Sequence, residues 1–310
     1  MNRSNSCSAQ YKDFFESEDS MLNTDQIETY RKDGYLVVPD VIAPAQIARA
    51  REKLAELIEA SRRVSESNSI YDLEDSHTPQ NPRVRRIKDP HVLDPVFASL
   101  LRAPEILDIV AQLIGQDLRM EHTKLNIKPA RGGEPVEWHQ DWAFYPYTND
   151  DILEVGVMIE DCTLANGPLL VLPGSHRGSV FDHHHQGYFS GAIDPSAPGL
   201  NIRKAVAITG KAGTISLHHV RTVHGSRENL SESDRPMLLL GYCSADAWPL
   251  RSDAFKDLDS FNARMLRGKP TLEPRLRGVP VRMPYPPAPH QGSIFENQKL
   301  VKGRSFAQAG

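Results

Sequence analysis

Residues 137–146 read EWHQDWAFYP, and they place a histidine and an aspartate one residue apart, at His139 and Asp141. Alternate side chains of a β-strand leave from the same face, so an extended backbone would point this imidazole and this carboxylate the same way. Together they would form two thirds of the 2-His-1-carboxylate site that holds non-haem iron(II) in oxygenases. The spacing alone is more typical of a structural hydrogen-bonded pair, so the metal site depends on a second histidine from elsewhere in the chain.

Composition and charge are those of an ordinary soluble globular protein. The chain has 310 residues, of which 39% are hydrophobic and 25% charged, and its formal net charge of −4 gives no reason to expect nucleic acid as a partner. Its three cysteines have no paired spacing, which argues against disulfides or a thiolate zinc site. The N-terminus lacks the apolar core of a signal peptide, and no run approaches the ~18 apolar residues of a membrane span. We therefore expect a cytoplasmic protein with no membrane partner.

The pattern of apolar residues divides the chain into four parts. Residues 1–20 predict a flexible tail, and 21–115 predict supporting helices with a long loop at 64–90. From about 116 to 248, six or more short apolar segments between turn residues predict strands. The segment 249–310 is rich in arginine and proline and predicts an extended backbone. The whole of 21–310 is expected to form one domain, mainly β with flanking helices, in a barrel or sandwich without βαβ alternation.

Several downstream histidines compete for the third position of the metal site. His224 has the best placement, because a predicted strand ends at VHGS, where Gly225 and Ser226 open a turn. His218 shares the same strand face but would lie about 20 Å back along the barrel wall by strand rise. His219 would face the other way. His176, in PGSH, is expected to be a structural turn residue.

Arg235 is the next residue that a cosubstrate would need. The chain resumes after the loop GSRENLSESD as RPMLLLGY, a predicted return strand headed by Arg235, so a hairpin would bring it near His224. A guanidinium binds a carboxylate bidentately through its planar fork of donors. Metal ligands beside such a group are what an oxygenase that uses 2-oxoglutarate requires.

Three motifs in this order resemble the phytanoyl-CoA dioxygenase family of Fe(II)/2-oxoglutarate-dependent oxygenases. They are HQD at 139–141, NGPLLVLPGSH at 166–176 and HGSRENLSESDR at 224–235, and the opening YRKDGYLVVPDVIAP is also similar, so the likeness covers most of 22–248. The resemblance implies a double-stranded β-helix, a jelly-roll or cupin-like barrel. It also implies an enzyme that uses Fe(II), 2-oxoglutarate and O2 and releases succinate and CO2.

The resemblance assigns roles residue by residue. His139, Asp141 and His224 would be the metal ligands and the catalytic centre. Arg235 would bind the far carboxylate of 2-oxoglutarate with help from Ser226, and Asn126 and Lys128 on the preceding strand would be further cosubstrate contacts. The substrate would be a small organic metabolite or natural-product intermediate, most often hydroxylated in this family, and the protein a monomer or homodimer.

Four residues are candidates for the substrate pocket. Trp142 and Phe144 follow the HQD motif, although core packing explains them equally well. His184 lies in DHHHQGYF, a predicted loop near the site that would otherwise be plain surface. Arg282, like Arg277, would reach an anionic substrate if the C-terminal segment folds over the opening.

Two other functional classes remain open from the residues alone. A cupin-type metal-dependent dioxygenase or isomerase would use the same metal ligands without 2-oxoglutarate and would not need Arg235. A non-catalytic binding protein would keep the barrel without the chemistry, and the intact set of candidate ligands argues against it.

Overall fold

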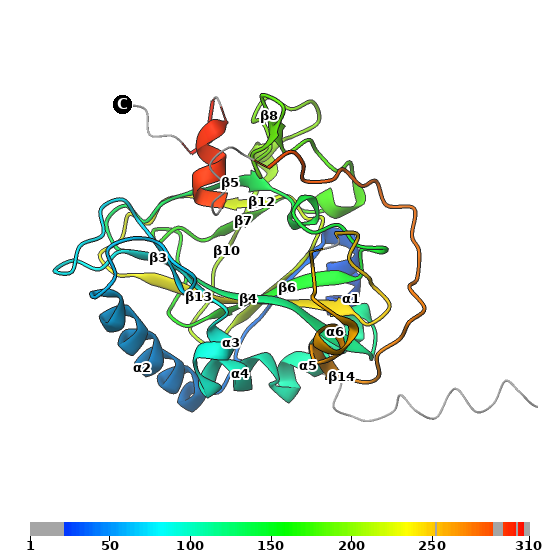
Figure 1. The fold of residues 1–310 in the computed structure, drawn as a ribbon, viewed down its shortest axis with the longest axis horizontal. Coiled ribbons are helices and arrows are strands. Elements are labelled where there is room, and N and C mark those ends of the chain that lie inside the picture. Colours follow the sequence, from blue (N-terminus) through cyan, green and yellow to red (C-terminus); the bar gives the residue numbers. More distant parts are fainter. Residues whose placement is uncertain (1–21, 252, 288–293, 302, 307–310) are drawn as a thin grey trace, which may run out of the picture.

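The computed structural model describes residues 22–251, 253–287, 294–301 and 303–306, so the predicted N-terminal tail lies outside the described residues. Within this part of the chain, an eight-stranded and a four-stranded antiparallel sheet face each other (Figure 1). This arrangement is the double-stranded β-helix that the sequence predicted.

The large sheet has the order β1-β11-β6-β13-β4-β3-β2, and β14 also pairs with β4. Its strands are β1 (Tyr35–Val38), β2 (Tyr71–Leu73), β3 (Val84–Lys88), β4 (Leu118–Lys128), β6 (Ile152–Met158), β11 (Ile215–His219), β13 (Arg235–Ser244) and β14 (Met265–Arg267).

The small sheet has the order β10-β7-β12-β5, and a separate short hairpin joins β8 to β9. These strands are β5 (Val136–His139), β7 (Leu169–Val171), β8 (His184–His185), β9 (Tyr188–Phe189), β10 (Val206–Ile208) and β12 (His224–Ser226).

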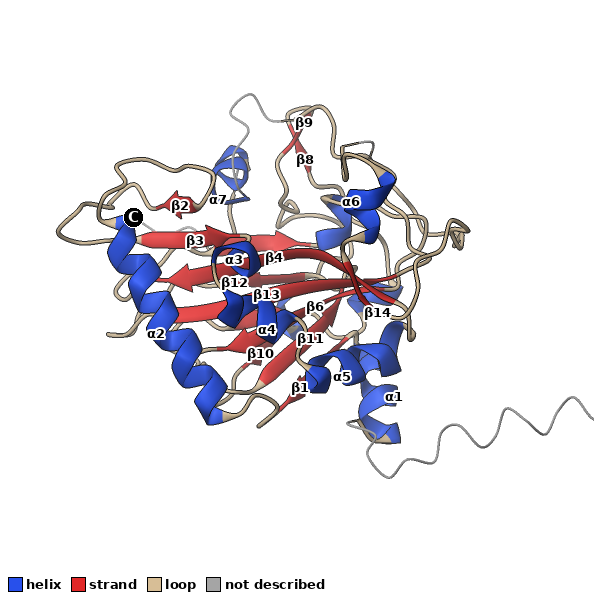
Figure 2. Cartoon of the chain, turned by 60° about the horizontal axis from the view of Figure 1, so that its bottom comes forward, coloured by secondary structure: helices blue, strands red, loops and turns tan. Residues whose placement is uncertain are grey.

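Helices lie across the face of the large sheet that points away from the small one (Figure 2). They are α2 (Pro44–Ser61), α3 (Pro90–Leu93), α4 (Pro95–Leu101) and α5 (Pro104–Ile114), each with a proline in its first turn, where the missing N–H is harmless. The first helix, α1 (Thr24–Asp33), has a capping box between Asn23 and Gln26 and ends at Gly34, whose φ of 77° suits a residue without a side chain.

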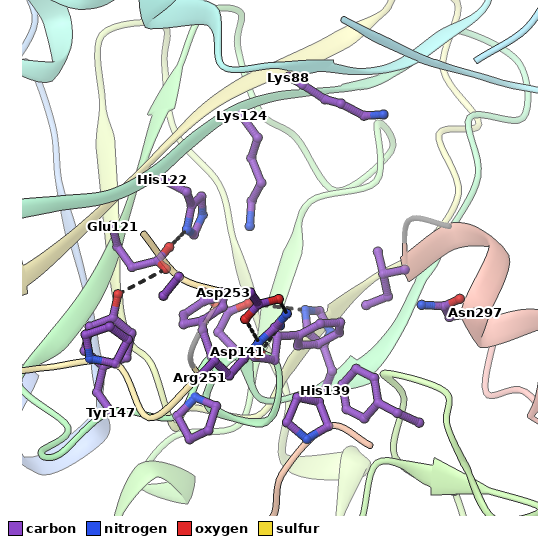
Figure 3. Close-up of a pocket in the computed structure, with 18 of the residues that line it drawn as sticks. Lys88, Glu121, His122, Lys124, His139, Asp141, Tyr147, Arg251, Asp253 and Asn297 are labelled. Atoms are coloured by element: carbon purple, nitrogen blue, oxygen red, sulfur yellow. Dashed lines mark hydrogen bonds and ion pairs between the residues drawn. The ribbon is translucent and has the colours of Figure 1, made fainter. Parts of the chain in front are cut away.

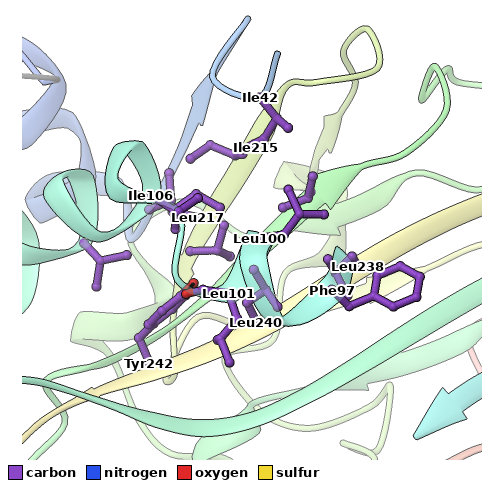
Figure 4. Packing of buried hydrophobic residues seen from close by; sticks show 14 of the residues in the cluster. Ile42, Phe97, Leu100, Leu101, Ile106, Ile215, Leu217, Leu238, Leu240 and Tyr242 are labelled. Atoms are coloured by element: carbon purple, nitrogen blue, oxygen red, sulfur yellow. Dashed lines mark hydrogen bonds between the residues drawn. The ribbon is translucent and has the colours of Figure 1, made fainter. Parts of the chain in front are cut away.

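The main hydrophobic core fills the space between these helices and the large sheet (Figure 4). Phe97 and Leu101 of α4 are fully buried and belong to one cluster with Leu238 and Leu240 of β13. The hydroxyl of Tyr242, on the same strand face, donates a hydrogen bond of 2.9 Å to the carbonyl of Leu101. Burial of this apolar surface provides the main driving force for folding.

Two segments contain more regular structure than the sequence predicted. The expected loop at 64–90 includes β2 and β3, which extend the large sheet beside β4. The expected extended segment 249–310 includes α6 (Leu258–Asn262), β14 and α7 (Ile294–Asn297). Short strands supported by pairing across the sheet carry little local signal, which is why the patterns missed them. No helix within the described residues is long and apolar enough to cross a bilayer.

The C-terminal residues complete the edge of the small sheet. The side-chain oxygen of Gln298 accepts a hydrogen bond of 2.9 Å from the backbone N–H of Glu137, and its amide donates to the carbonyl of Pro135 at 3.0 Å. The ring of Phe306 packs on Trp138, with ring centroids 5.6 Å apart. These contacts cover β5, which would otherwise be an open edge strand.

Phe97→Ala tests the position of the core. Because this ring is fully buried between α4 and the sheet, we expect its removal to lower the free energy of unfolding by about 3–5 kcal/mol. Leu164→Ala is the control, since that side chain is 78% exposed and should change stability by less than about 0.5 kcal/mol. Urea unfolding followed by circular dichroism measures both, and equal effects would contradict the assigned core.

Candidate active site

Strand pairing in the small sheet brings the two predicted histidine ligands together. His224 of β12 lies directly opposite His139 of β5, and their ring centroids are 4.1 Å apart. Asp141 follows at the start of a 3-10 turn (Asp141–Ala143) rather than on the strand, because β5 ends at His139. Its carboxylate oxygens lie 3.8 Å from the Nε2 atoms of His139 and of His224. All three side chains are buried, and one ligand atom from each lies within 4.8 Å of the others.

The tautomers of these two histidines suit metal binding. Nδ1–H of His139 donates to the carbonyl of Glu137 at 2.8 Å, and Nδ1–H of His224 donates to that of Thr222 at 2.9 Å. Each Nε2 therefore presents a lone pair toward Asp141. Burial, with the neighbouring His218 imidazole, lowers the pKa of His224 to about 4. Burial, with His224, also holds the pKa of His139 well below its usual range. Two neutral imidazoles and a carboxylate are the donor set of a non-haem iron(II) site.

His218 lies much closer to this site than the sequence predicted. Its Nε2 is 3.3 Å from Oδ2 of Asp141, and its ring centroid is 4.4 Å from that of His224. The expected separation assumed one continuous strand, but the chain leaves β11 at His219 and enters β12 of the other sheet at His224. The fold therefore brings the two imidazoles side by side. His219 faces away from the site, as expected, with Nε2 3.8 Å from Asp150.

Gln140, the residue between His139 and Asp141, anchors the loop on which Asp141 lies. Its side chain donates to the carbonyls of Ser179 and Arg221 and accepts from the N–H of Phe181 at 2.9 Å. Its backbone N–H donates to Nε2 of His183 at 2.9 Å. His183 is thus a buried structural residue. His176 has a similar role, because its ring nitrogen bonds the carbonyl of Arg31 at 3.1 Å.

An inner cavity on one side of the triad ends at two buried basic residues, Arg235 and Lys128. Arg235 is 6% exposed and lies opposite Lys128 in the β13–β4 register. Burial, together with Arg235, holds the pKa of Lys128 well below its usual range. One guanidinium nitrogen of Arg235 donates to the carbonyl of Gly167 at 2.6 Å, whereas its buried Nε has no partner within the described residues. Ser226 and Asn126 line the same cavity.

The strand pairing that brings Arg235 to the site differs from the predicted pairing. The sequence predicted a hairpin between its strand and that of His224, but β13 pairs with β4 and β6 in the large sheet, whereas β12 pairs with β5 and β7 in the small one. Arg235 and His224 therefore approach each other across the space between the sheets, and both line the inner cavity.

A larger outer cavity, of about 580 Å³, lies on the other side of His139 and Asp141 (Figure 3). His139, Asp141 and Lys124 line both cavities, so the triad lies where they meet. A volume of this size is within the range of small-molecule sites.

Only one of the four predicted pocket residues lines this outer cavity. Phe144 does, with its ring edge-on to His139 at 5.9 Å. Trp142 is 1% exposed in a separate core cluster, where its Nε1–H donates to the carbonyl of Pro280. His184 bonds Asp182 and the carbonyl of Tyr285 instead. Arg282 pairs with Asp182 at 2.7 Å, which keeps it outside both cavities.

Arg277, the second C-terminal arginine, is also directed away from the outer cavity. It contacts Asp150 and Asp151, each at 3.1 Å. The C-terminal segment therefore does not bring this cation to the site.

Two further residues of the outer cavity, His122 and Lys124, were not predicted, although the alternation of side chains along β4 indicates them. His122 and Lys124 precede Asn126 and Lys128 on β4 at the same two-residue spacing, so their side chains leave from the same face. Both line the outer cavity. Arg86 and Lys88 on β3 line it too, and they were hidden because β3 was expected to be loop.

The stability of the metal-free protein is expected to fall in acid, in part because of His183. Burial lowers the pKa of this histidine to about 4, so the neutral form is favoured in the folded state. This contribution is complete above an unfolded pKa of about 6.5 and is lost as the pH falls toward 4, by about 2 kcal/mol between pH 7.5 and 5.0.

His183→Gln keeps an acceptor for the N–H of Gln140 and removes the titration. Urea unfolding of the wild-type and variant proteins at both pH values measures the difference. The wild type should lose about 2 kcal/mol more than the variant between the two. An identical loss in both proteins would show that His183 does not titrate as a buried group.

Comparison with known proteins agrees with this geometry. The profile of the phytanoyl-CoA dioxygenase (PhyH) family matches residues 30–237. A probable alpha-ketoglutarate-dependent hypophosphite dioxygenase of Stutzerimonas stutzeri is 36% identical over 286 residues, which cover 91% of this chain and 99% of the relative. An ectoine dioxygenase of Bordetella parapertussis is 28% identical over 73% of this chain and 76% of the relative.

Solved structures show the same fold. The crystal structure of EctD from S. alaskensis with 2-oxoglutarate and 5-hydroxyectoine has a TM-score of 0.63 and 26% identity, and covers 86% of this chain and 90% of that one. The same protein with bound Fe matches equally well. The matched motifs, the buried triad and these relatives together show that the chain belongs to the phytanoyl-CoA dioxygenase family of iron- and 2-oxoglutarate-dependent dioxygenases.

Proposed function

We propose that His139, Asp141 and His224 bind the iron(II) of this dioxygenase, that the inner cavity binds 2-oxoglutarate, and that the outer cavity admits a small molecule for hydroxylation. One observation carries the proposal: the triad lies where a smaller cavity, lined by Arg235 and Lys128, meets a larger one. This arrangement separates the cosubstrate from the substrate and lets both reach the same centre.

The convergence of three acceptors supports a cation at the triad. The Nε2 lone pairs of His139 and His224 face the carboxylate of Asp141 at 3.8 Å, beyond hydrogen-bond distance. Acceptors that point at one another in a buried space are unfavourable unless a cation or protons lie between them. Burial and the neighbouring imidazoles disfavour protons on either ring, so a metal ion fits this donor set.

The inner cavity has the chemistry of a dicarboxylate site. The guanidinium of Arg235, with its unpartnered Nε, supplies N–H donors in a planar fork. Lys128 adds a second cation, although its ammonium already donates to the carbonyl of Glu134 at 2.5 Å. Ser226 and Asn126 supply further polar groups on the same wall. Burial lowers the pKa of both Lys128 and Arg235 because it removes their charge from water, and a bound carboxylate would offset that cost.

The remaining residues position the reactants and exclude water. When bound, iron(II) supplies the O2-dependent oxidation of this family, with conversion of 2-oxoglutarate to succinate and CO2. Phe144 and Phe189, whose ring centroids are 5.0 Å apart, form an apolar wall of the outer cavity beside His139. A dry wall of this kind protects a reactive centre from solvent.

Substrate size follows from the cavity and from the relatives. Relatives are named for hypophosphite, ectoine and L-proline, which supports a small-molecule substrate here. The cytoplasmic location and the monomeric or homodimeric state stay predictions from the sequence.

Removal of a proposed ligand should abolish tight iron binding. We expect His224→Ala and Asp141→Ala each to weaken iron(II) binding by more than about 100-fold, above the 10–100-fold typical of outer-shell changes. Anaerobic titration with a colorimetric iron assay measures the affinity. His184→Ala is the control, because that imidazole contacts Asp182 outside both cavities. Unchanged iron binding in the His224 variant would place the metal elsewhere.

Replacement of Arg235 should affect the cosubstrate alone. We expect Arg235→Ala to raise the apparent KM for 2-oxoglutarate about 10- to 100-fold, because a charge-assisted hydrogen bond contributes roughly 1.5–3 kcal/mol. Arg235→Lys should recover only part of the loss, since an ammonium lacks the planar fork. Succinate release gives the KM, and iron stoichiometry should remain at the wild-type value. Equal KM values in all three proteins would remove Arg235 from the cosubstrate site.

A further inference from the structure

The inner faces of β3 and β4 form a row of polar side chains that runs through both cavities. On β4, His122 lies in the outer cavity, Lys124 in both, and Asn126 and Lys128 in the inner one. Lys88 of β3 is paired in register with Lys124, and both lie in the outer cavity. The part of this row nearest to the triad is therefore cationic.

Lys124 differs from the other cations of this wall in having no close partner. Its ammonium approaches only Glu154, at 3.9 Å, and makes no hydrogen bond within the described residues. Glu154 is itself engaged by Nε2 of His122 at 3.0 Å. Although burial acts against it, this carboxylate and Glu121 raise the pKa of His122 to about 9. The imidazolium is thus shared between two carboxylates, and the contact of Lys124 with Glu154 is longer than that of His122.

The neighbouring cations are satisfied within the protein. Lys88 pairs with Asp72 at 2.7 Å, and Arg86 lies 3.7 Å from the same carboxylate. Arg251 pairs with Asp253. The remaining cation, Arg264, donates to backbone carbonyls, including that of Ala254 at 3.1 Å.

Lys124 points into the space above Asp141. Figure 3 shows its side chain extending from β4 toward that carboxylate, and the side chain keeps 22% of its surface exposed. Asp141 also contacts His218 at 3.3 Å, and in the proposed function its charge is taken by the metal. Lys124 then lies at the substrate side of the centre, with the carboxylate of Glu154 at 3.9 Å and no hydrogen bond within the described residues.

The outer cavity is also lined by apolar and aromatic side chains. Phe144, Phe189 and Ile294 line it together with Tyr145 and Tyr285. The cavity thus combines aromatic side chains with an ammonium that makes no hydrogen bond within the described residues, in a volume of about 580 Å³. Such a combination fits a molecule with a small apolar body and one anionic end.

From these contacts we infer that the substrate is a small organic anion, a carboxylate or a phosphonate, whose charged group binds the ammonium of Lys124. This inference rests on the proposed function, because the outer cavity is a substrate site only if the triad holds the iron. Lys124 would select for charge, and the aromatic wall would direct the apolar body past His139.

Binding of simple probes to the anaerobic iron(II)–2-oxoglutarate complex tests this inference. Propionate and ethylphosphonate are the anionic probes, and propionamide is the neutral counterpart. Perturbation of the visible absorption band of that complex gives the dissociation constants. We expect an anion to bind and propionamide not to, and the ratio of the two anion affinities distinguishes a carboxylate from a phosphonate substrate.

Variants assign the effect to Lys124. Lys124→Met should weaken binding of the anion about 10- to 100-fold, and Lys124→Arg should retain most of it. Lys211→Met is the matched control, because that lysine is 83% exposed and pairs with Asp161. The apparent affinity for 2-oxoglutarate should be the same in the wild type and in Lys211→Met, and in the two Lys124 variants it should change less than the affinity for the anion.

Three results would overturn the inference. The first is that neither anion perturbs the band. The second is that propionamide binds as well as the anions do. The third is that Lys124→Met weakens the binding of 2-oxoglutarate and leaves the binding of the anions unchanged. In the last case Lys124 would serve the cosubstrate. If the band itself never forms in iron-loaded wild-type protein, the proposed function fails, and this inference fails with it.

Discussion

The backbone pairing of His139 with His224 is the constraint on which the site depends. β12 has only three residues, and it is held between β5 and β7. Since side chains alternate along a strand, a slip of one residue would turn His224 out of the cavity. Gly225 permits the close pairing, because a Cβ there would lie 3.0 Å from the carbonyl oxygen of Val136. The small sheet therefore sets the geometry of the centre before any ligand is bound.

Because side chains alternate along the strands of the large sheet, one face of the sheet packs in the hydrophobic core and the other face lines the cavities. On β4, Leu125 and Ile127 face the helices in the hydrophobic core, whereas Lys124, Asn126 and Lys128 face the cavities. Core residues on one face provide the apolar burial that allows cations to be buried on the other. The two cavities are thus supported by helices α2 to α5, none of which lines them.

Features that depend on one strand alone were predicted correctly from the sequence. The resemblance assigned Asn126 and Lys128, which share one face of a strand by the alternation of side chains, and the turn after VHGS placed His224 at a strand end; the structure has both features. Applied to the four residues that precede Asn126, the alternation of side chains would also have indicated Lys124 and His122. The jelly-roll fold was predicted from the motif order, because no local pattern distinguishes a barrel from a sandwich.

The predictions that were wrong concern residues that lie far apart in the sequence. The distance of His218 and the hairpin of Arg235 were both wrong because the chain changes sheets between 219 and 224 and again before 235. Neither sheet membership nor the pairing of β3 has a local signal. Trp142 was ambiguous for a different reason: a buried indole near a motif looks the same in sequence whether it packs in the core or lines a cavity.

The three imidazoles around Asp141 have two different roles. His139 and His224 donate through Nδ1 to carbonyls and so present lone pairs, whereas His218 directs Nε2 at the carboxylate, which can only accept. His218 therefore donates to Oδ2 and orients Asp141 without competing for a cation. The converging lone pairs of the other two gain nothing from one another in the metal-free protein. The free-energy cost of removing these nitrogen atoms from water is offset only when a cation binds. Metal affinity and folding stability are therefore linked through the same buried atoms.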